Sequence, residues 1–466
     1  MKNKETLGVK TLLGDPKKAI IKLSVPMIFA MLIHTLYNVI DAIWVAGLGS
    51  NALAAVGFTF PFFILAMGLA NGVGIGGSSA ISRRIGAKDK PGADNIAIHS
   101  IILIIIVTIA YTVPLFLLAR PLFELMGAGE TIGLTLAYSQ VIFIGSFFLF
   151  FSNIANAILR GEGDAKRAMY AMALGGILNI ILDPIFIYTL DMGIAGAAWA
   201  TILSLAISSI ILCYWLLFKK NTYVDFQFKY FQFNKDILKE IFSVGLPAGV
   251  QQMSMSLSMI ILNLLIVSVS NTDGVAVYTT GWRIVMIAVL PLMGIATAIV
   301  SVSGAAYGEK AYDKVNISHL YAVKIGLIIE IILGILTFIF APQIVSIFTQ
   351  SEGTMHIADD LVVFTRIMVL FYPGASLGML SASILQGIKH GFIALVSTIL
   401  RALIFTTLFA YLFALVIGMD LVGVWWGIII ANLSGGIIAF LWARNIIKQL
   451  LGKQTLDANY KNSIGD

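Results

Sequence analysis

Long runs of apolar residues restrict the fold of this chain more than any other feature of its sequence. A helix needs about 20 mostly apolar residues to cross the hydrocarbon core of a bilayer. Of the 466 residues, 59% are hydrophobic and 12% are charged, whereas soluble proteins are about 25% charged. The runs predict an all-α membrane protein with twelve transmembrane helices. Their approximate centres are Ile33, Leu65, Ile105, Phe147, Ile180, Leu205, Met255, Leu290, Ile332, Leu370, Leu403 and Leu433.

The basic residues lie in alternate connections between these runs. One set of connections holds nearly all of them, including Lys17, Arg83, Lys166 and Lys219, whereas Arg120 is the basic residue near the other set. The positive-inside rule then places both termini and the 219–239 connection in the cytoplasm of a cell (plasma) membrane protein. Because the positive charge is spread over short loops, it does not indicate a nucleic-acid partner.

The second half of the sequence repeats features of the first half in the same order. Pro26 recurs at Pro247, Gly86 at Gly308, Gly161 at Gly387 and Trp199 at Trp426, with an offset that grows slowly along the chain. We therefore expect an N-terminal lobe (1–218), a cytoplasmic or interfacial connection (219–239) and a C-terminal lobe with its tail (240–466). Six spans in each half predict a pseudo-two-fold axis along the membrane normal.

Four oxygen-bearing side chains are predicted to share one layer of the N-terminal lobe. Asp41 lies roughly 9 Å, and Asp183 roughly 12 Å, from the outer ends of their helices at about 1.5 Å per residue. Asn179 is one helical turn from Asp183, and Thr201 lies at a similar depth on the next helix. A charged group inside a membrane costs roughly 2.5–3.5 kcal/mol on insertion scales, so such acids mark a functional site by default.

Carboxylate, amide and hydroxyl oxygens are hard donors that suit a hard cation or a shared proton. Two neighbouring acids in a medium of low dielectric titrate as a coupled pair, which allows a site to load and release protons. The position equivalent to Asp41 in the second half is Leu262, so this chemistry is confined to the first half. A purely structural role, in which the acids bond neighbouring hydroxyl groups, stays open.

Two prolines and a second set of charges complete the candidate residues. Pro26 and Pro184 each remove a helical hydrogen bond, and they are expected to act as hinges or as static kinks. The second half carries intramembrane charges for which we expect structural pairing with one another: Arg283, Lys324, Glu330, Arg366 and Arg401. No hydrolase, Walker A or zinc-protease motif occurs in a sensible context, so the chain is not expected to be an enzyme.

Taken together, these residues resemble those of the multidrug and toxic compound extrusion (MATE) family, in its DinF-like prokaryotic and archaeal branch. The resemblance covers all twelve spans. The residues that carry it are Pro26, Tyr37–Asp41, Ile158–Asp164, Asn179, Asp183–Pro184 and Gly193–Thr201.

The resemblance implies a MOP-type fold of two six-helix lobes around a V-shaped cleft. It implies export of bulky, often cationic organic compounds by antiport with H⁺ or Na⁺, without a cofactor, by a monomer in the bilayer. The matching ion or proton site, with Na⁺ as a possible ligand, would be Asp41, Asn179, Asp183 and Thr201, and bending of the first helix would be the switch. The matching cavity residues would be His34, Tyr37, Asn38, Asn156, Met172 and Ser204.

Two other functions remain open. A flippase of the same superfamily for lipid-linked oligosaccharides or peptidoglycan precursors would need several basic residues along both halves of the cleft, because its cargo is anionic. A channel is less compatible with one buried acidic site and proline-weakened helices. Another branch of the family has an acidic pair on helices 7 and 10. Here those positions read Met255 and Ala375, so the resemblance does not extend to that second site.

Overall fold

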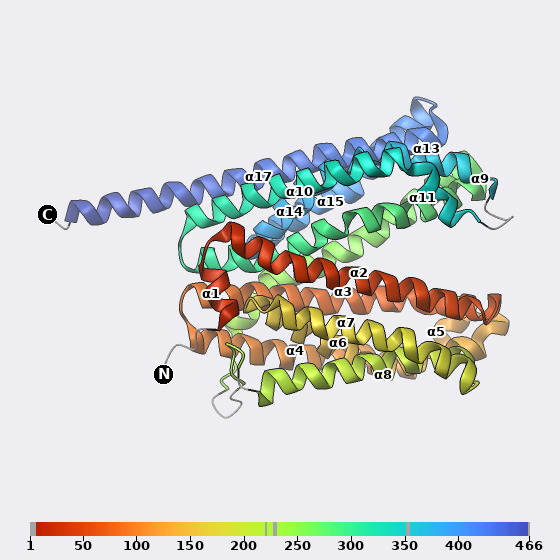
Figure 1. The fold of residues 1–466 in the computed structure, drawn as a ribbon, viewed down its shortest axis with the longest axis horizontal. Helices are drawn as coiled ribbons and strands as arrows, with labels where there is room; N and C mark the ends of the chain where they lie inside the picture. The colour runs from red at the N-terminus through yellow and green to blue at the C-terminus, as the bar shows by residue number, and fades with distance from the viewer. Residues whose placement is uncertain (1–5, 220, 227–230, 351–354, 465–466) are drawn as a thin grey trace. The chain divides into compact units, whose positions relative to one another are not determined.

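The computed structural model describes residues 6–219, 221–226, 231–350 and 355–464, and the regular structure in these ranges is helical (Figure 1). The first half contains α1 (Leu7–Leu13), α2 (Pro16–Ala46), α3 (Ser50–Gly86), α4 (Lys90–Leu117), α5 (Ala119–Leu125), α6 (Ile132–Gly161), α7 (Ala165–Pro184) and α8 (Gly193–Cys213). The second half contains α9 (Lys235–Gly308), α10 (Tyr312–Ile339), α11 (Ala341–Phe348), α13 (Ala358–Met368), α14 (Phe371–Gly387), α15 (Gly391–Ile399), α16 (Thr406–Tyr411) and α17 (Asp420–Ile464).

Eleven helices in the described ranges are long and apolar enough to cross a membrane. A twelfth span is formed by α13 and α14, which meet at a 51° bend. α9 supplies two of the spans, Lys235–Ser270 and Asp273–Gly308. The prediction of an all-α membrane protein with about twelve spans is confirmed. The short helices α1, α5 and α11 were not predicted, because seven or eight residues are too few to show a clear helical period.

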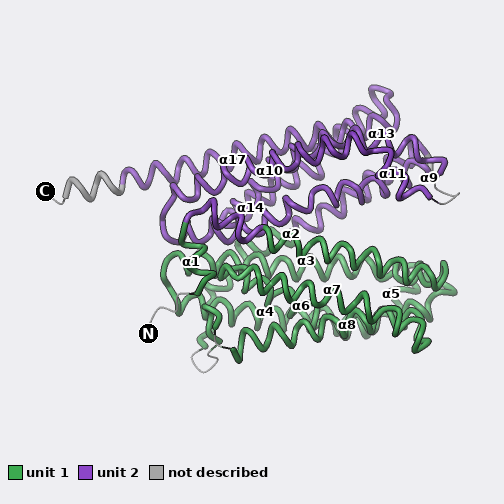
Figure 2. The backbone as a smooth tube through the Cα atoms, in the orientation of Figure 1, with its two compact units in different colours: residues 1–14, 25–249 green, residues 15–24, 250–466 purple. Residues whose placement is uncertain are grey.

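The chain forms two compact units (Figure 2). Unit 1 comprises 1–14 and 25–249, and unit 2 comprises 15–24 and 250–466. The division passes through α2 between Ser24 and Val25, one residue before Pro26, and through α9 two residues after Pro247. Each unit therefore takes the start of one long helix from the other half, and in both cases the division lies beside the repeated proline.

The backbone conformation shows the internal repeat at the ends of the helices. Lys88 and Lys310 both have φ of 58°, at equivalent turns after the second and eighth spans. Gly163 and Lys389 also both have positive φ, of 83° and 69°. The π-helix after α7, η2 (Ile185–Thr189), recurs as the π-helix η6 (Leu412–Val416). Tyr411 stands where Pro184 stands in the first half, so a proline is not required for this π-turn.

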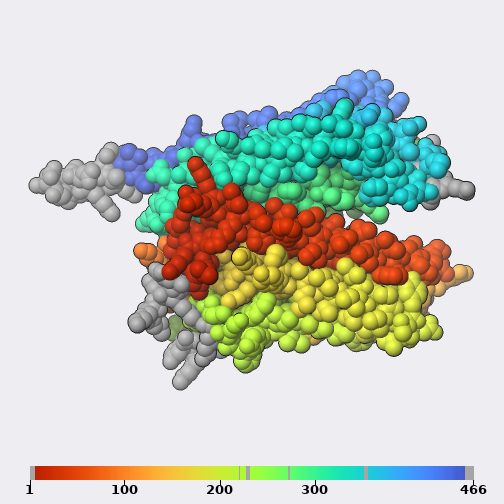
Figure 3. Space-filling view, in the orientation of Figure 1, coloured from red at the N-terminus to blue at the C-terminus, as the bar shows by residue number. Residues whose placement is uncertain are grey.

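α2 has two faces of different character. A regularly spaced apolar set, Phe29, Leu32, Leu36, Val39 and Ile43, is exposed along one face, and α2 (red) is open along much of its length in the space-filling view (Figure 3). The polar residues His34, Tyr37 and Asp41 have the same spacing of three and four residues on another face, and they are partly buried. Exposed apolar surface of this extent fits a membrane environment better than water.

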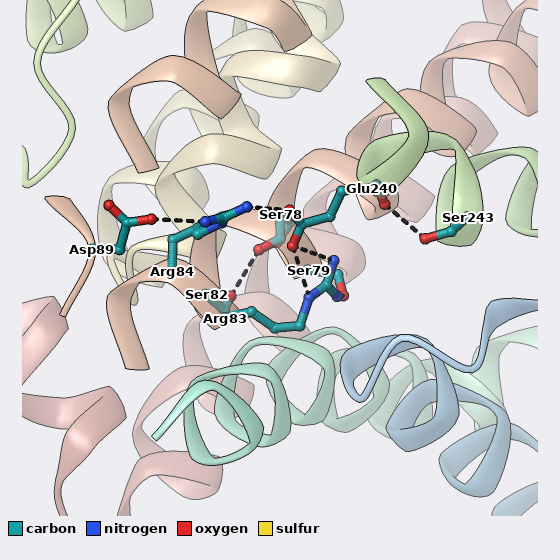
Figure 4. A network of polar contacts seen from close by, with 8 residues as sticks. All are labelled: Ser78, Ser79, Ser82, Arg83, Arg84, Asp89, Glu240 and Ser243. Carbon is teal, nitrogen blue, oxygen red and sulfur yellow. Dashed lines mark hydrogen bonds and ion pairs between the residues drawn. The ribbon is translucent and has the colours of Figure 1, made fainter. Parts of the chain in front are cut away.

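Glycines allow α3 and the start of α9 to pack closely within unit 1. A Cβ atom at Gly76 would lie 2.4 Å from the Ile241 carbonyl oxygen, and one at Gly72 would lie 2.9 Å from that of Gly245. At the end of this crossing, Arg83 and Arg84 both reach Glu240 (Figure 4). The distances to the two Glu240 oxygens are 3.2 Å from Arg83 Nη2 and 2.8 Å from Arg84 Nη2. In the repeat, the positions equivalent to Arg83, Arg84 and Glu240 are occupied by Ala305, Ala306 and Ala19. The second half therefore has no equivalent of this ion-pair network.

Glu162 attaches the central connection to unit 1. Its side chain is 2% exposed, and its Oε2 accepts hydrogen bonds from the backbone N–H groups of Tyr223 (2.8 Å) and Val224 (3.1 Å). Further along, the rings of Phe231 and Phe233 pack against His99. Residues 227–230 of the predicted cytoplasmic or interfacial connection lie outside the described ranges.

We expect Glu162→Gln to remove a pH dependence of stability. Burial raises the pKa of Glu162 from the ordinary value of 4.5 to about 8. Between these values the folded state binds more protons than the unfolded state, so the free energy of unfolding falls as pH rises. The contribution lost is about 2–4 kcal/mol. Thermal melts in detergent from about pH 5 to about pH 9 measure it, and identical slopes for the variant and the wild type would contradict the prediction.

The predicted pairing among the charges of the second half is wrong for Arg401. This buried side chain, on η5 (Leu400–Phe405), donates to Asn432 Oδ1 rather than to an acid, and Asn432 in turn donates to the Phe371 carbonyl (2.7 Å). Arg366 lies over the Phe338 ring at 5.5 Å. The reason is that an uncharged amide with a fixed orientation can satisfy a guanidinium without a second buried charge.

We expect Arg401→Ala to lower stability without changing the choice of coupling ion. The substitution leaves a cavity beside Gly378 and Gly435, both of which contact Arg401, and it leaves Asn432 Oδ1 without its donor. The cost is about 2–4 kcal/mol. Thermal unfolding in detergent measures the loss, and a stable variant whose ion dependence has switched would count against the prediction.

Candidate functional site

The candidate site of unit 1 is formed where α2, α7 and α8 meet. Gly176 of α7 allows α2 to approach, since a Cβ atom there would lie 3.1 Å from both Ile33 Cγ2 and Tyr37 Cδ1. Asp41 follows Ile33 by about two turns of α2, and Asp183 follows Gly176 by about two turns of α7. The close contact therefore carries both acids to the same level.

Asn179 connects α7 to α8 within this site. Its Nδ2 donates to Asp183 Oδ1 (3.0 Å) and lies 3.4 Å from Thr201 Oγ1. Asp183 is 0% exposed and Asn179 is 3% exposed. Asp183 Oδ2 and Asn179 Oδ1 are buried and accept no hydrogen bond from a described N–H or hydroxyl donor. The site thus presents two unused oxygens.

Asp41 and Asp183 are close enough to interact electrostatically. Two ionised carboxylates repel each other in a medium of low dielectric, and a proton or a cation beside them removes this repulsion. The structure therefore brings Asp41, Asn179, Asp183 and Thr201 together, with a set of oxygen donors that fits H⁺ or Na⁺.

Sequence reasoning missed Tyr138 of α6. This half-buried tyrosine is close enough to interact electrostatically with Asp41, Asp183 and Tyr37. It packs against the cluster that contains Ala197 and Ile187. No pattern in the sequence distinguishes it, because tyrosines are common in transmembrane helices and its helix carries no acid near this depth.

The π-helix η2 is attached to the C-terminal end of α2. The Tyr188 hydroxyl donates to the Trp44 carbonyl (2.7 Å), and the two rings meet edge to face at 6.0 Å. A Cβ atom at Gly47 would collide with this hydroxyl. π-turns often occur at functional sites. Here the π-turn begins next to Pro184, two residues after the site acid, so it connects Asp183 to the end of the helix that carries Asp41.

The predicted cavity residues are distributed over two places. His34 lies beside Tyr37, with Nε2 3.3 Å from the hydroxyl, and beside Asn38, whose Nδ2 is 3.0 Å from Nδ1. Asn156 is buried on α6 and donates to the Ser152 carbonyl (2.8 Å), while its Oδ1 has no hydrogen-bond partner among the described residues.

Ser204 bonds the Ala200 carbonyl of its own helix, and Met172 is half-buried on α7. Sequence reasoning missed a further amide pair near Asn156, in which Asn153 donates to Asn71 Oδ1 (3.1 Å).

The second half lacks this site at the equivalent positions. Alignment of the two π-helices places Asp183 opposite Ala410 and Thr201 opposite Ile428, and Asp41 corresponds to Leu262. All three equivalents are buried apolar residues. The helices are repeated, but the polar site belongs to unit 1 alone.

Comparison with known proteins gives one family. The MatE family model matches residues 26–185 and 247–412. The multidrug export protein MepA of Staphylococcus saprophyticus is 29% identical over 94% of this chain and 95% of its own length. A multidrug resistance MATE transporter solved in an outward-facing conformation is 47% identical, with a TM-score of 0.94 over 96% of this chain and 100% of that one.

A third relative is described by the polarity of its binding pocket. It is a MOP superfamily transporter from Pyrococcus furiosus, described as having a binding pocket of reverse polarity that suggests a different function. It is 47% identical, with a TM-score of 0.93 over 96% of this chain and 99% of that one. Because the family model matches both halves and solved MATE structures superpose over nearly the whole chain, this protein belongs to the MATE family of membrane transporters.

Proposed function

We propose that this protein is a secondary active multidrug exporter that moves bulky, often cationic organic compounds out of the cell by antiport with H⁺ or Na⁺. The observation that carries the proposal is the closeness of Asp41 to Asp183 inside unit 1, where the two acids interact electrostatically. The pair needs one positive charge to be stable, and H⁺, Na⁺ or a nearby organic cation supplies it. Competition between these cations for the acid pair is the basis of exchange.

The hydrogen bonds of the site give the acids different tasks. Asp183 is held by Asn179, which also lies beside Thr201, so it has a fixed orientation. Asp41 is partly exposed on the polar face of α2, next to Tyr37 and His34. Asp41 is therefore the group that meets both the incoming ion and the departing compound, and Asp183 is the group that holds the ion in place.

Bending of α2 is the proposed switch, with Pro26 and Pro184 as hinges. Pro26 interrupts the hydrogen bonds of α2 one residue past the division between the two units. A helix weakened at that point can bend when Asp41 gains or loses its positive partner. Pro184 directly precedes the π-turn, and Tyr188 of that turn donates a hydrogen bond to Trp44 at the C-terminal end of α2. A movement at Asp183 is therefore transmitted to α2, the helix that carries Asp41.

A flippase for lipid-linked oligosaccharides or peptidoglycan precursors is the alternative function. The relative from Pyrococcus furiosus is described as having a pocket of reverse polarity that suggests a different function. The charge of the transported compound is therefore the property to test. The described acids of unit 1 favour cationic cargo, because an anion would be repelled by Asp41 unless basic residues faced it.

Efflux of a cationic dye from proteoliposomes tests the proposal. We expect efflux under an imposed inward H⁺ or Na⁺ gradient, and the two gradients applied separately identify the ion. Efflux without any gradient would indicate a channel. Movement of a lipid-linked sugar without dye efflux would establish the flippase.

We also propose a monomer in the cell membrane with both termini and the 219–239 connection in the cytoplasm, and with no nucleic-acid partner. The one-sided distribution of Lys and Arg supports the orientation. Protease added to intact cells should leave the connection uncut and should cut it once the membrane is permeabilised. Cleavage in intact cells would refute this orientation.

A further inference from the structure

Unit 2 contains a buried acid that the proposed transport mechanism does not use. Glu330, near the middle of α10, is 0% exposed. Neither of its carboxyl oxygens has a hydrogen-bond partner among the described residues. A buried carboxylate without partners costs several kcal/mol, so a bound positive charge is the ordinary way for a protein to keep one.

Two hydroxyl groups of α14 lie on the face that Glu330 meets. One turn before Glu330, a Cβ atom at Gly326 would lie 2.6 Å from Ser376 Oγ. One turn after it, a Cβ atom at Gly334 would lie 3.5 Å from the Tyr372 ring. Tyr372 and Ser376 are themselves one turn apart on α14. Glu330 therefore faces the segment between these two side chains, and it interacts electrostatically with Tyr372.

Both hydroxyl groups are also unused. Tyr372 and Ser376 are each 0% exposed, and the oxygen of each lacks a hydrogen bond of normal geometry to any described residue, although Thr337 lies beside the tyrosine. Three unpartnered polar groups in one fully buried place are uncommon, since buried polar groups are nearly always hydrogen-bonded.

The charged groups of the neighbouring helices do not neutralise Glu330. Arg366 of α13 lies over the Phe338 ring, two turns beyond Glu330 on α10. Arg444 of α17 bonds Asn316 at the start of α10, and His319 of α10 lies beside Ser381 Oγ (3.0 Å). The other basic residues in or near this part of unit 2 are Arg283, Lys324 and Arg401, and within the described ranges none of them forms an ion pair with Glu330.

We propose that Glu330, Tyr372 and Ser376 form a binding site for one monovalent cation, H⁺ or Na⁺, inside unit 2. A single carboxylate with two hydroxyl oxygens supplies one negative charge and hard neutral donors, which suits a cation of charge one better than a divalent ion. The site is separate from the Asp41–Asp183 pair. It lies on different helices, and its acid is not the repeat equivalent of either aspartate.

The test uses the full-length protein with Asp41→Asn and Asp183→Asn, so that the acids of unit 1 no longer contribute. The first arm measures the carboxyl stretching band by infrared difference spectroscopy as pH is changed, with and without Glu330→Gln. Glu162 contributes equally to both proteins, so their difference isolates Glu330. The second arm measures thermal unfolding as Na⁺ replaces choline at constant ionic strength.

A pH-dependent carboxyl band that Glu330→Gln removes supports a proton site. A rise in unfolding temperature with Na⁺ that Glu330→Gln removes supports a sodium site. If neither signal depends on Glu330, the proposal is overturned. Because the background lacks both aspartates, these outcomes do not depend on whether unit 1 couples transport.

Tyr372→Phe provides a second, milder variant that keeps the Glu330 carboxyl. We expect the loss of one oxygen donor to weaken Na⁺ binding about tenfold. For a proton site, we expect an equivalent shift in the pH midpoint of the carboxyl band. An unchanged midpoint in both arms would exclude the Tyr372 hydroxyl from the site.

Discussion

Asp41→Asn and Asp183→Asn should each abolish gradient-driven dye export while the protein stays folded. Asparagine keeps the shape of the side chain, and its amide can donate a hydrogen bond to a neighbouring carboxylate. It removes only the charge and the titration, on which exchange depends. Because an ionised buried group is costly, the unfolding temperature should hold or rise slightly.

Efflux from proteoliposomes under a proton or sodium gradient measures the loss, and melting in detergent checks the fold. The matched control is Asp191→Asn, which makes the same chemical change at an exposed turn of unit 1. Asp191 has φ of 52°, a conformation that asparagine also tolerates, so this variant should export at the wild-type rate. Wild-type efflux in both site variants would leave only a structural role for the two acids.

Glu240→Ala should cost about 3 kcal/mol of stability. The side chains of Arg83 and Glu240 are 6% and 11% exposed. Glu240 also binds Arg84, so its removal leaves two guanidinium groups short of a partner at a crossing where glycine backbones are in contact. Partly buried charges that lose their counterion are destabilising, because they cannot regain full hydration.

Chemical or thermal unfolding of the purified protein measures this cost. Glu124→Ala is the matched control, since Glu124 forms an ion pair with Arg120 at 2.9 Å but both side chains are more than half exposed. That pair should be worth less than about 0.5 kcal/mol. Equal losses in the two variants would show that the Glu240 network of Figure 4 contributes no more to the free energy of unfolding than an exposed ion pair does.

Much of the architecture could be read from the sequence because a membrane imposes simple rules. Apolar length sets the spans, and the offset between the repeated motifs anticipates the paired turns at Lys88 and Lys310. The depth of Asp41, Asn179 and Asp183 could be counted along each helix, since every residue advances it by about 1.5 Å. The layer of the site was therefore predictable.

Contacts between helices could not be read in this way. The approach of α2 to α7 depends on Gly176, and the contribution of Tyr138 depends on how α6 is rotated about its own axis. The expectation that Arg401 would pair with an acid failed because Asn432, on the next span, offers an amide at the right place.

By itself, then, the sequence determined the approximate number of membrane spans, the repeat and the depth of each polar residue, because hydrophobic length and helical rise are local properties. Only the tertiary structure decided which of those polar residues meet. It brought Asp41 to Asp183 and left Glu330 facing Tyr372 and Ser376 without a hydrogen bond. The physical reason is that the rotation and close packing of helices depend on side chains from several of them at once.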